Sequence, residues 1–454
     1  MRNSACSKHL VRVLGWSLLF SALSLSIPAV AVAGLWQDYR GLYDRRLEEF
    51  KGYDIWGNTF LPPAGMWFFQ YKYNTVRSNT RFGADRKEGP ILAPVDIMGG
   101  TLDFGPRGTA RAHKFMFICG LGRRWAIGCE AQVGTIDLAF DVDYHPPQDP
   151  STQLVAHLIG RRYHVKPFTE SLEGLWETLE LLGHPRPVLE RQEGGLQAGD
   201  VALAIGYNYY RSKLVSCLAA LKLSLPTGHI ADSNSALVFA LGPDLDVGVG
   251  SFGFEFGHLL DIRLPKPLDW IVFMNELYYS NYTTHTRTSP TVFTRPNQEV
   301  LKVLNTLGTD LGPYFPDLSR MEPEYSYHPG SKVRGVLQVA PALFGILPVS
   351  LGIQGTYTNA SEIITTTPEF VEYINAIGLL ADSWLIDSWV KVTLGLFPFR
   401  IPVALSAGYN MPIAGKNSLI LKDNWEFTFQ FYSPWFFGEQ IVDLRKEAKK
   451  RQGP

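Results

Sequence analysis

The sequence predicts an all-β protein, an antiparallel up-and-down β-barrel of about 14 strands (12–16) that spans a membrane. Two observations lead to this prediction: short segments in which apolar and polar side chains alternate, and a cleavable export signal in front of them. Successive residues of a strand point to opposite faces of a sheet, so each segment presents one apolar and one polar surface. In a membrane barrel the apolar surface meets lipid and the polar surface lines the lumen.

The alternation is clearest in three segments of the chain. Aromatic side chains occupy the odd positions from Trp67 to Tyr73, opposed by Gln70, Lys72 and Asn74, and the odd positions of Trp425–Phe431, opposed by Glu426, Thr428 and Gln430. In Ala202–Tyr210, large apolar side chains alternate with alanine, glycine and asparagine. A composition of 13% aromatic and 19% charged residues suits aromatic girdles and a polar interior better than a compact enzyme.

Residues 1–33 are predicted to be a secretory signal that is removed on export. Basic residues precede the apolar stretch Val13–Ala22, and Ala31-Val32-Ala33 provides a small-residue cleavage site. An uncleaved membrane anchor is disfavoured, because Pro28 interrupts the apolar run. Cleavage leaves 421 residues with 39 basic and 43 acidic side chains, a balance that argues against nucleic-acid binding. We expect the mature chain in the bacterial outer membrane, with lipid and the outer-membrane assembly machinery as partners.

No membrane-spanning helix is predicted in the mature chain. The best candidate, Val336–Ile353, contains Pro341 and Pro348, each of which would break the helical hydrogen-bond ladder. A β-hairpin that turns near Gly345–Leu347 accounts for the same residues.

The mature chain divides into three predicted regions. Residues 34–60 contain an amphipathic helix, Leu35–Phe50, that could plug the barrel, lie on the membrane surface or pack under the rim. Residues 61–437 form the barrel, with a helical insertion at residues 145–199. Residues 438–454 form a charged C-terminal tail.

Fifteen segments have the pattern of strands, whereas bacterial barrels have an even number. The extra segment is explained by a break at Gly134. The polar side chains are at even positions before it (Glu130, Gln132) and at odd positions after it (Asp137), so the polar face changes parity. Such a change requires either a tight turn or a β-bulge, and treating Gly134 as a bulge joins two segments and leaves fourteen strands. The segments are Gly65–Arg77, Pro94–Phe104, Arg111–Leu121, Arg124–Val133, Thr135–Tyr144, Asp200–Arg211, Leu214–Pro226, Ser235–Val247, Gly250–Leu264, Asp269–Thr283, Lys332–Phe344, Leu347–Thr358, Trp389–Phe397, Ile401–Asn410 and Trp425–Tyr432.

Fourteen strands place the long loops Thr284–Ser331 and Asn359–Ser388 outside the cell and the 145–199 insertion in the periplasm. Long periplasmic segments are unusual, so the insertion is interpreted either as a sign that the strand count is off by one or as a separate cap or plug. Helices are predicted over Thr169–Leu182, Asn297–Leu307 and Pro368–Leu380.

Three stretches of sequence carry a resemblance to a known family. They are Gly199–Arg211 with Leu221–Gly228 (GDVALAIGYNYYR and LKLSLPTG), Leu61–Gly65 (LPPAG), and Val403–Ile413 (with GYNMP). They are similar to a family of outer-membrane proteins named for a phenol meta-degradation pathway and allied to the long-chain fatty-acid transporters. The resemblance implies a barrel that passes small hydrophobic or aromatic molecules. The 145–199 insertion and the C-terminal tail depart from the pattern of that family.

Polar side chains on the inward faces are the candidate functional residues. A Lys or Arg facing lipid costs about 2–4 kcal/mol at the membrane midplane, so the lumen is where ionised groups belong. They either hydrate and brace the lumen or select cations or the polar end of a ligand. The lumen-lining candidates are Gln70, Lys72, Glu130, Gln132, Asp137, Asp141, Asp143, Glu255, Glu426 and Gln430.

Two alternative function classes are a lipid hydrolase and a plugged structural barrel. Tyr282–Thr288 (YTTHTRT) faintly resembles the segment of outer-membrane phospholipase A that supplies a His, a Ser and an Asn. The serine expected two residues after His285 is replaced by Arg287, so we expect no catalytic residues and no enzymatic activity. Cys119, Cys129 and Cys217 have no C-x-x-C spacing and are expected to be free, packed thiols. The histidines are scattered, and no metal or cofactor is expected.

Overall fold

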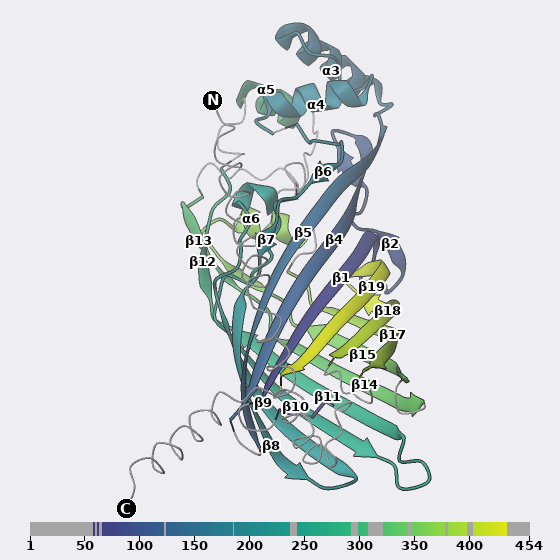
Figure 1. The fold of residues 1–454 in the computed structure, drawn as a ribbon. Coiled ribbons are helices and arrows are strands. Elements are labelled where there is room, and N and C mark those ends of the chain that lie inside the picture. Colours follow the sequence, from purple (N-terminus) through teal and green to yellow (C-terminus); the bar gives the residue numbers. More distant parts are fainter. Residues whose placement is uncertain are drawn as a thin grey trace, which may run out of the picture. The chain divides into compact units, whose positions relative to one another are not determined.

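A computed structural model describes residues 58–59, 61–62, 66–121, 124–184, 186–236, 243–291, 298–306, 321–343, 347–376, 380–396 and 403–433. The predicted signal at 1–33, the helix Leu35–Phe50 and the 438–454 tail lie outside these residues. The described residues form one compact unit, built on a large antiparallel sheet (Figure 1).

The sheet is a closed barrel of 12 strands, which confirms the predicted fold class. Consecutive barrel strands are neighbours, and the first strand, β1, pairs with both β19 and β4, so the barrel has no open edge. The barrel strands are β1 (Trp67–Phe82), β4 (Gly100–Gly120), β5 (Trp125–His145), β8 (Val201–Arg211), β9 (Val215–Leu225), β10 (Gly253–Arg263), β11 (Ile271–Tyr282), β14 (Lys332–Leu343), β15 (Leu347–Thr358), β17 (Ser383–Gly395), β18 (Val403–Lys416) and β19 (Ser418–Ser433).

The outer face of the barrel is apolar. Leu203 is 48% exposed, Phe427 is 46% exposed, and the same outward positions on the other strands carry Leu, Ile, Phe, Tyr and Trp. Closure pairs the backbone groups of every strand, which is the condition for crossing hydrocarbon. An apolar exterior on such a barrel is the architecture of an outer-membrane protein. Among the described residues, no helix is both long and apolar enough to span a membrane.

The strand number lies in the predicted range but is two below the single best value of fourteen. Pro94–Phe104 and Arg111–Leu121 belong largely to one strand, β4, and the described part of Ser235–Val247 is a 3₁₀ turn and a loop. The bulge predicted at Gly134 is wrong, because β5 pairs with β4 through Gly134 without a shift of register. The hairpin predicted within Val336–Ile353 is confirmed as β14 and β15.

With twelve strands, the insertion after β5 emerges at the same barrel end as the other long connections (Figure 1). The prediction from fourteen strands that the insertion lies on the side opposite the loops Thr284–Ser331 and Asn359–Ser388 is therefore wrong. The long connections contain helices α3 (Pro150–Tyr163), α4 (Leu172–Leu181), α5 (Gln298–Thr306) and α6 (Pro368–Ala376), the turn η1 (Ser233–Ala236), and the short strands β2 (Glu88–Pro90), β3 (Val95–Ile97), β6 (Gln192–Glu193), β7 (Gln197–Ala198), β12 (His285–Thr288), β13 (Glu324–His328) and β16 (Glu362–Ile364).

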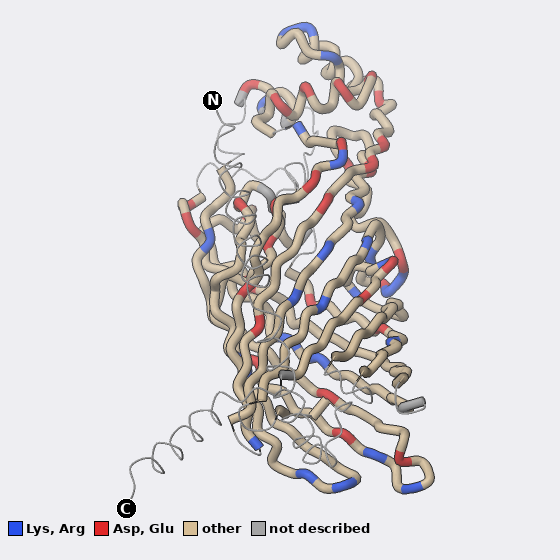
Figure 2. Tube along the Cα trace, viewed as in Figure 1, with Lys and Arg blue, Asp and Glu red and all other residues tan. Residues whose placement is uncertain are grey.

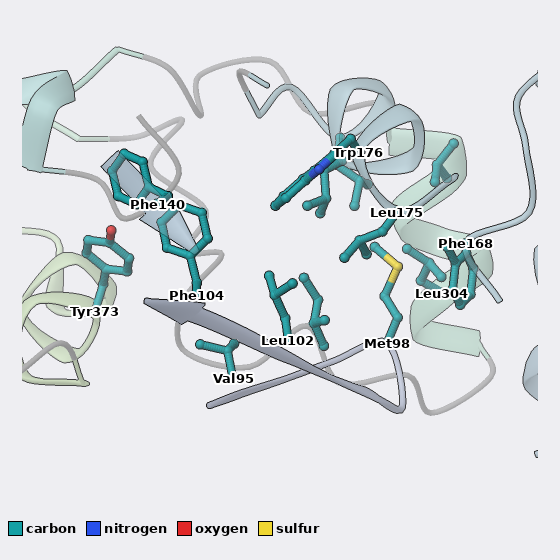
Figure 3. Close-up of a cluster of buried hydrophobic side chains, with 14 of the residues drawn as sticks. Val95, Met98, Leu102, Phe104, Phe140, Phe168, Leu175, Trp176, Leu304 and Tyr373 are labelled. Atoms are coloured by element: carbon teal, nitrogen blue, oxygen red, sulfur yellow. The ribbon is translucent and has the colours of Figure 1, made fainter. Parts of the chain in front are cut away.

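The long connections fold together around one hydrophobic core, which we call the cap core (Figure 3). Phe104 and Phe140 from β4 and β5 stack with their ring centroids 4.7 Å apart. Leu175 of α4, Leu304 of α5 and Tyr373 of α6 are fully buried in the same cluster. Side chains from four separate connections are thus removed from water together, which fixes these connections to one another.

Along β4 and β5 the two faces exchange polarity: the face that is polar within the barrel is apolar beyond it. On β5, Glu130 and Leu138 have the same parity and lie on the same face, because the register with β4 is continuous. Within the barrel that face lines the lumen and is polar; beyond the barrel it is covered by the cap core and is apolar. The parity change noted at Gly134 marks this exchange and not a defect of the strand.

Local signals explain where the two insertion helices begin. Asp149 caps α3 by accepting a 2.9 Å hydrogen bond from the amide of Thr152, and Pro150 follows it in the first turn. Ser171 caps α4 by accepting from the amide of Gly174 at 3.2 Å. The predicted helix over Thr169–Leu182 is confirmed as α4, and the two other predicted helices correspond to α5 and α6.

The three described cysteines are free, as predicted. Cys129 has the outward parity of β5 and is exposed, so the prediction that it is a packed thiol is wrong.

We predict that the cap, meaning the long connections that pack around the cap core, loosens in mild acid because of His184. This side chain is 5% exposed, and burial lowers its pKa from the ordinary 6.5 to about 3. The unfolded cap takes up a proton near pH 6.5, whereas the folded cap does not, so stability is lost as the pH falls from about 6.5 toward 3. Between pH 7 and pH 5 the loss is about 2 kcal/mol. The readout is the urea midpoint of Trp176 fluorescence, isolated by subtracting the signal of a Trp176→Phe variant.

His157→Gln provides the control for this prediction, because His157 is an exposed histidine of the same insertion. It is expected to keep the acid response, whereas His184→Gln is expected to lose it. An identical urea midpoint at pH 7 and pH 5 would show that protonation of His184 does not open the cap.

Candidate functional site

Charged side chains on the inner face form a chain of ion pairs around the barrel wall. Lys114 of β4 lies 2.8 Å from Glu130 of β5, and Glu130 lies 3.6 Å from Lys222 of β9. Lys222 in turn lies 3.4 Å from Glu255 of β10, whose second oxygen accepts a 2.9 Å hydrogen bond from Ser280 of β11. The chain therefore continues across neighbouring strands over half of the barrel.

Small residues allow this chain to cross β8, which supplies no charge. Glu130 is paired in register with Ala202, and Ala204 is paired with Lys222. Two alanines leave the space above β8 free, so the carboxylate of β5 reaches the ammonium of β9. The alternation of large and small side chains in this segment was predicted. The structure shows that the small side chains on the inner face leave room for the ion pair between β5 and β9.

A second chain of ion pairs crosses β18 in the same way. Lys72 of β1 lies 2.6 Å from Glu426 of β19, and Lys391 of β17 lies 3.6 Å from the other oxygen of Glu426. Gly408 of β18 is paired in register with both Glu426 and Lys391. Without a side chain at position 408, the carboxylate and the ammonium meet across the strand between them.

The two chains meet where Lys72 and Lys114 are paired in register on β1 and β4. Like charges in directly opposite positions repel each other, and here each lysine is held by a carboxylate on its other side. We call these seven side chains the lumen belt; charged residues of both signs lie along the barrel strands (Figure 2). The lumen belt consists of Lys72, Lys114, Glu130, Lys222, Glu255, Lys391 and Glu426.

Aromatic side chains on the inner face lie over glycines of the neighbouring strand. A Cβ atom added at Gly257 would lie 2.8 Å from the ring of Tyr278, and one at Gly352 would overlap the ring of Trp389. The rings therefore lie against the wall and present their faces to the lumen. The ammonium of Lys391 lies 5.6 Å from the centre of the Trp389 ring, a cation–π contact.

The residues just before β1 lie inside the barrel at the end with the short turns. The amide and the hydroxyl of Thr59 donate hydrogen bonds of 2.8 and 2.6 Å to one carboxylate oxygen of Asp261 on β10. Asn208 of β8 donates to the carbonyl oxygen of Thr59 at 3.4 Å, and Asn58 donates to Glu276 of β11. Thr59 and Asp261 are both buried, so this segment occupies part of the lumen cross-section.

The structure separates the predicted lumen candidates into two groups. Lys72, Glu130, Glu255 and Glu426 belong to the lumen belt, and Gln70, Gln132 and Gln430 have the same inward parity on β1, β5 and β19. The aspartates of β5 have the opposite parity, so the prediction that they line the lumen is wrong. Asp137 binds Arg111 at 3.4 Å and Arg191 at 2.9 Å, Asp141 binds Arg107 at 2.5 Å, and Asp143 lies 3.6 Å from His145.

The prediction for these aspartates failed because the outward face becomes polar where β5 leaves the membrane. Lys114, Lys222 and Lys391 were missed, although they have the inward parity of β4, β9 and β17. A signal was present in the sequence: each lysine lies two or four residues from another inward polar or small position of its strand. Asp261 was missed because its partner Thr59 lies 202 residues away in the sequence, and Trp389 because its position over Gly352 depends on the register of β15 with β17.

His285 lies on β12, in the small sheet formed with β13 and β16. Its Nε2 atom accepts a 3.2 Å hydrogen bond from Arg287, and its ring packs edge-on against Tyr327. Burial and the neighbouring charge of Arg287 lower the pKa of His285. One ring nitrogen is thus occupied by a cation and not by a nucleophile.

No protein-family model and no curated protein matches the chain. Among solved structures it is similar to an outer membrane channel from Pseudomonas putida F1, with 8% identity and a TM-score of 0.46 over 83% of this chain and 98% of that one. It is also similar to the translocator domain of the autotransporter NalP from Neisseria meningitidis (7% identity, TM-score 0.36, 89% and 96% covered). A third similar structure is a mutant of the TodX monoaromatic hydrocarbon channel (7% identity, TM-score 0.33, 82% and 90% covered). At these values the matches carry no information on substrate, and membership of the phenol-pathway family stays a prediction.

We predict that Asp261→Ala frees the lumen segment and opens the barrel. The change removes both hydrogen bonds that Thr59 makes to the carboxylate. Hydrogen bonds to a charged group contribute about 1.5–3 kcal/mol each, so the population with a displaced segment is expected to rise about tenfold or more. Single-channel recording in planar bilayers measures this as a larger or longer-lived open level.

The matched control is Asp269→Ala, which removes an exposed carboxylate from the short turn after β10. Its recordings are expected to equal those of the unaltered protein. Equal recordings for Asp261→Ala as well would mean that the Thr59–Asp261 contact does not restrict the lumen.

Proposed function

We propose that this protein is an outer-membrane channel for small hydrophobic or aromatic molecules. The observation that carries the proposal is the inner wall: flat aromatic faces backed by glycines, next to charges that are mostly neutralised in pairs. An apolar solute gains contact with Tyr278 and Trp389, and it does not have to strip water from isolated ions at the paired positions. The resemblance to the family named for phenol degradation supports the same solute class.

The contacts of His285 favour the channel over the hydrolase alternative. A serine hydrolase needs a histidine nitrogen within hydrogen-bond reach of its nucleophile. Among the described residues, the side chain that donates a hydrogen bond to the His285 ring is Arg287. We therefore expect no ester hydrolysis by the purified protein. A permanently plugged barrel would instead give no solute passage in the assay that follows.

We predict that Gly352→Val narrows the lumen and slows entry of apolar solutes. A branched side chain at position 352 takes the space of the Trp389 ring, which must swing away from the wall. The assay uses vesicles with lipopolysaccharide in the outer leaflet and a dye, N-phenyl-1-naphthylamine, that fluoresces on reaching hydrocarbon. The unaltered protein is expected to speed dye entry severalfold over protein-free vesicles, and Gly352→Val to abolish most of that gain.

Gly355→Val is the matched control. Gly355 lies on the outward parity of the same strand, and a Cβ atom there meets nothing within 4 Å. Dye entry through this variant is expected to equal that of the unaltered protein. Failure of the unaltered protein to speed dye entry at all would refute the proposed function.

A further inference from the structure

Two cations on the inner face of β14 differ from those of the lumen belt. Lys332 and Arg334 lie at the long-loop end of the strand, and their neighbours Val333 and Leu337 have the exposed, outward parity. Each lysine of the lumen belt has a carboxylate within 3.6 Å. In the part of the chain that the structure describes, neither Lys332 nor Arg334 forms an ion pair.

The positions opposite these two cations are neutral on both sides. On β11, Lys332 is paired in register with Ser280 and Arg334 with Tyr278. On β15, the opposite positions are Thr358 and Thr356. Hydroxyl groups that surround two cations offer hydrogen bonds without cancelling the charge.

The inward carboxylates Glu255 of β10 and Glu276 of β11 are already engaged. Glu255 contacts Lys222 with one oxygen and accepts from Ser280 with the other. Glu276 accepts from Asn58 of the lumen segment. Among the described residues, carboxylates therefore pair with the lysines of the lumen belt and not with Lys332 and Arg334.

Arg334 is held in place by an aromatic ring. Its guanidinium carbon lies 4.2 Å from the centre of the Tyr278 ring, and that ring is set against the wall over Gly257. A guanidinium stacked in this way keeps its edge free, and the edge is the part that binds a carboxylate with two parallel hydrogen bonds. Lys332, two residues away on the same face, adds a second positive charge.

The geometry points to Lys332 and Arg334 as a binding subsite for the carboxylate of a small apolar or aromatic acid. The inference rests on the proposed function, because the apolar body of the ligand would contact the aromatic wall described above. An anionic group of the ligand would balance the two positive charges that the described residues leave without an ion pair at this level of the lumen. Neutral aromatic molecules would pass the same point without binding to these two side chains.

Binding of benzoate, followed by saturation-transfer NMR on the detergent-solubilised protein, tests the inference. The unaltered protein is expected to bind benzoate more tightly than benzyl alcohol, which lacks the charge. Because a charge-assisted hydrogen bond contributes about 1.5–3 kcal/mol, Lys332→Gln and Arg334→Gln are each expected to weaken benzoate binding about tenfold or more. Benzyl alcohol binding is expected to stay unchanged in both variants.

Two controls make the result specific. Lys213→Gln removes an exposed cation from the short turn between β8 and β9, and it is expected to bind benzoate like the unaltered protein. Lys332→Arg keeps the charge and is expected to retain benzoate binding, which separates loss of charge from loss of fold. Benzoate binding that is absent in the unaltered protein, or equal in the Gln variants, would overturn the inference.

The outcomes also separate this inference from the proposed function. If the channel function is wrong, apolar dye does not enter vesicles faster, yet benzoate binding still depends on the two cations. If the subsite is wrong, dye entry remains sensitive to Gly352→Val while benzoate binding ignores Lys332 and Arg334.

Discussion

Closure of the sheet is the constraint on which the rest of this structure depends. Inside hydrocarbon every backbone amide and carbonyl needs a partner, and an open strand edge has none. The pairing of β1 with β4, from Trp67 opposite Cys119 to Ser78 opposite Gly108, removes the last edge. Once the barrel is closed, each side chain has one of two environments, lipid or lumen, and its parity decides which.

The lumen belt follows from this sorting. Seven strands contribute ionised side chains to the barrel interior, where solvation is limited and opposite charges lower each other's energy. Strands that carry alanine or glycine at the belt level, such as β8 at Ala202 and β18 at Gly408, let the ion pairs bridge them. Charge pairing and small residues are therefore two parts of one arrangement. It leaves the aromatic rings as the apolar surface of the wall.

The barrel could be predicted from the sequence because period-two alternation reports the two faces directly. Trp67, Leu203 and Phe427 all have the outward parity that their apolar character implied. The strand number could not be fixed in the same way, since β4 and β5 continue beyond the membrane into a different environment. There the inward Phe140 is buried in the cap core and the outward Asp141 meets water. The inward face is therefore apolar and the outward face polar, the reverse of the arrangement within the barrel.

The candidate site could be predicted only in part, for a related reason. Alternation identifies the face of Glu130 or Glu426, but not which distant strand supplies the partner. The contacts of Asp261 with Thr59 join residues 202 positions apart, and nothing local to either residue indicates them. Register around a closed barrel accumulates over all its strands, so lumen contacts depend on every turn and bulge between them.

The central claim is that the two faces of each barrel strand are divided between lipid and lumen. Its most direct measurement is electron paramagnetic resonance of spin labels placed singly at positions 254, 255, 256 and 257 of β10, in liposomes and in a background without cysteine. Labels at Phe254 and Phe256 are expected to collide readily with dissolved oxygen, and labels at Glu255 and Gly257 to show low oxygen collision, with a period of two. Equal oxygen accessibility at all four positions would contradict the account.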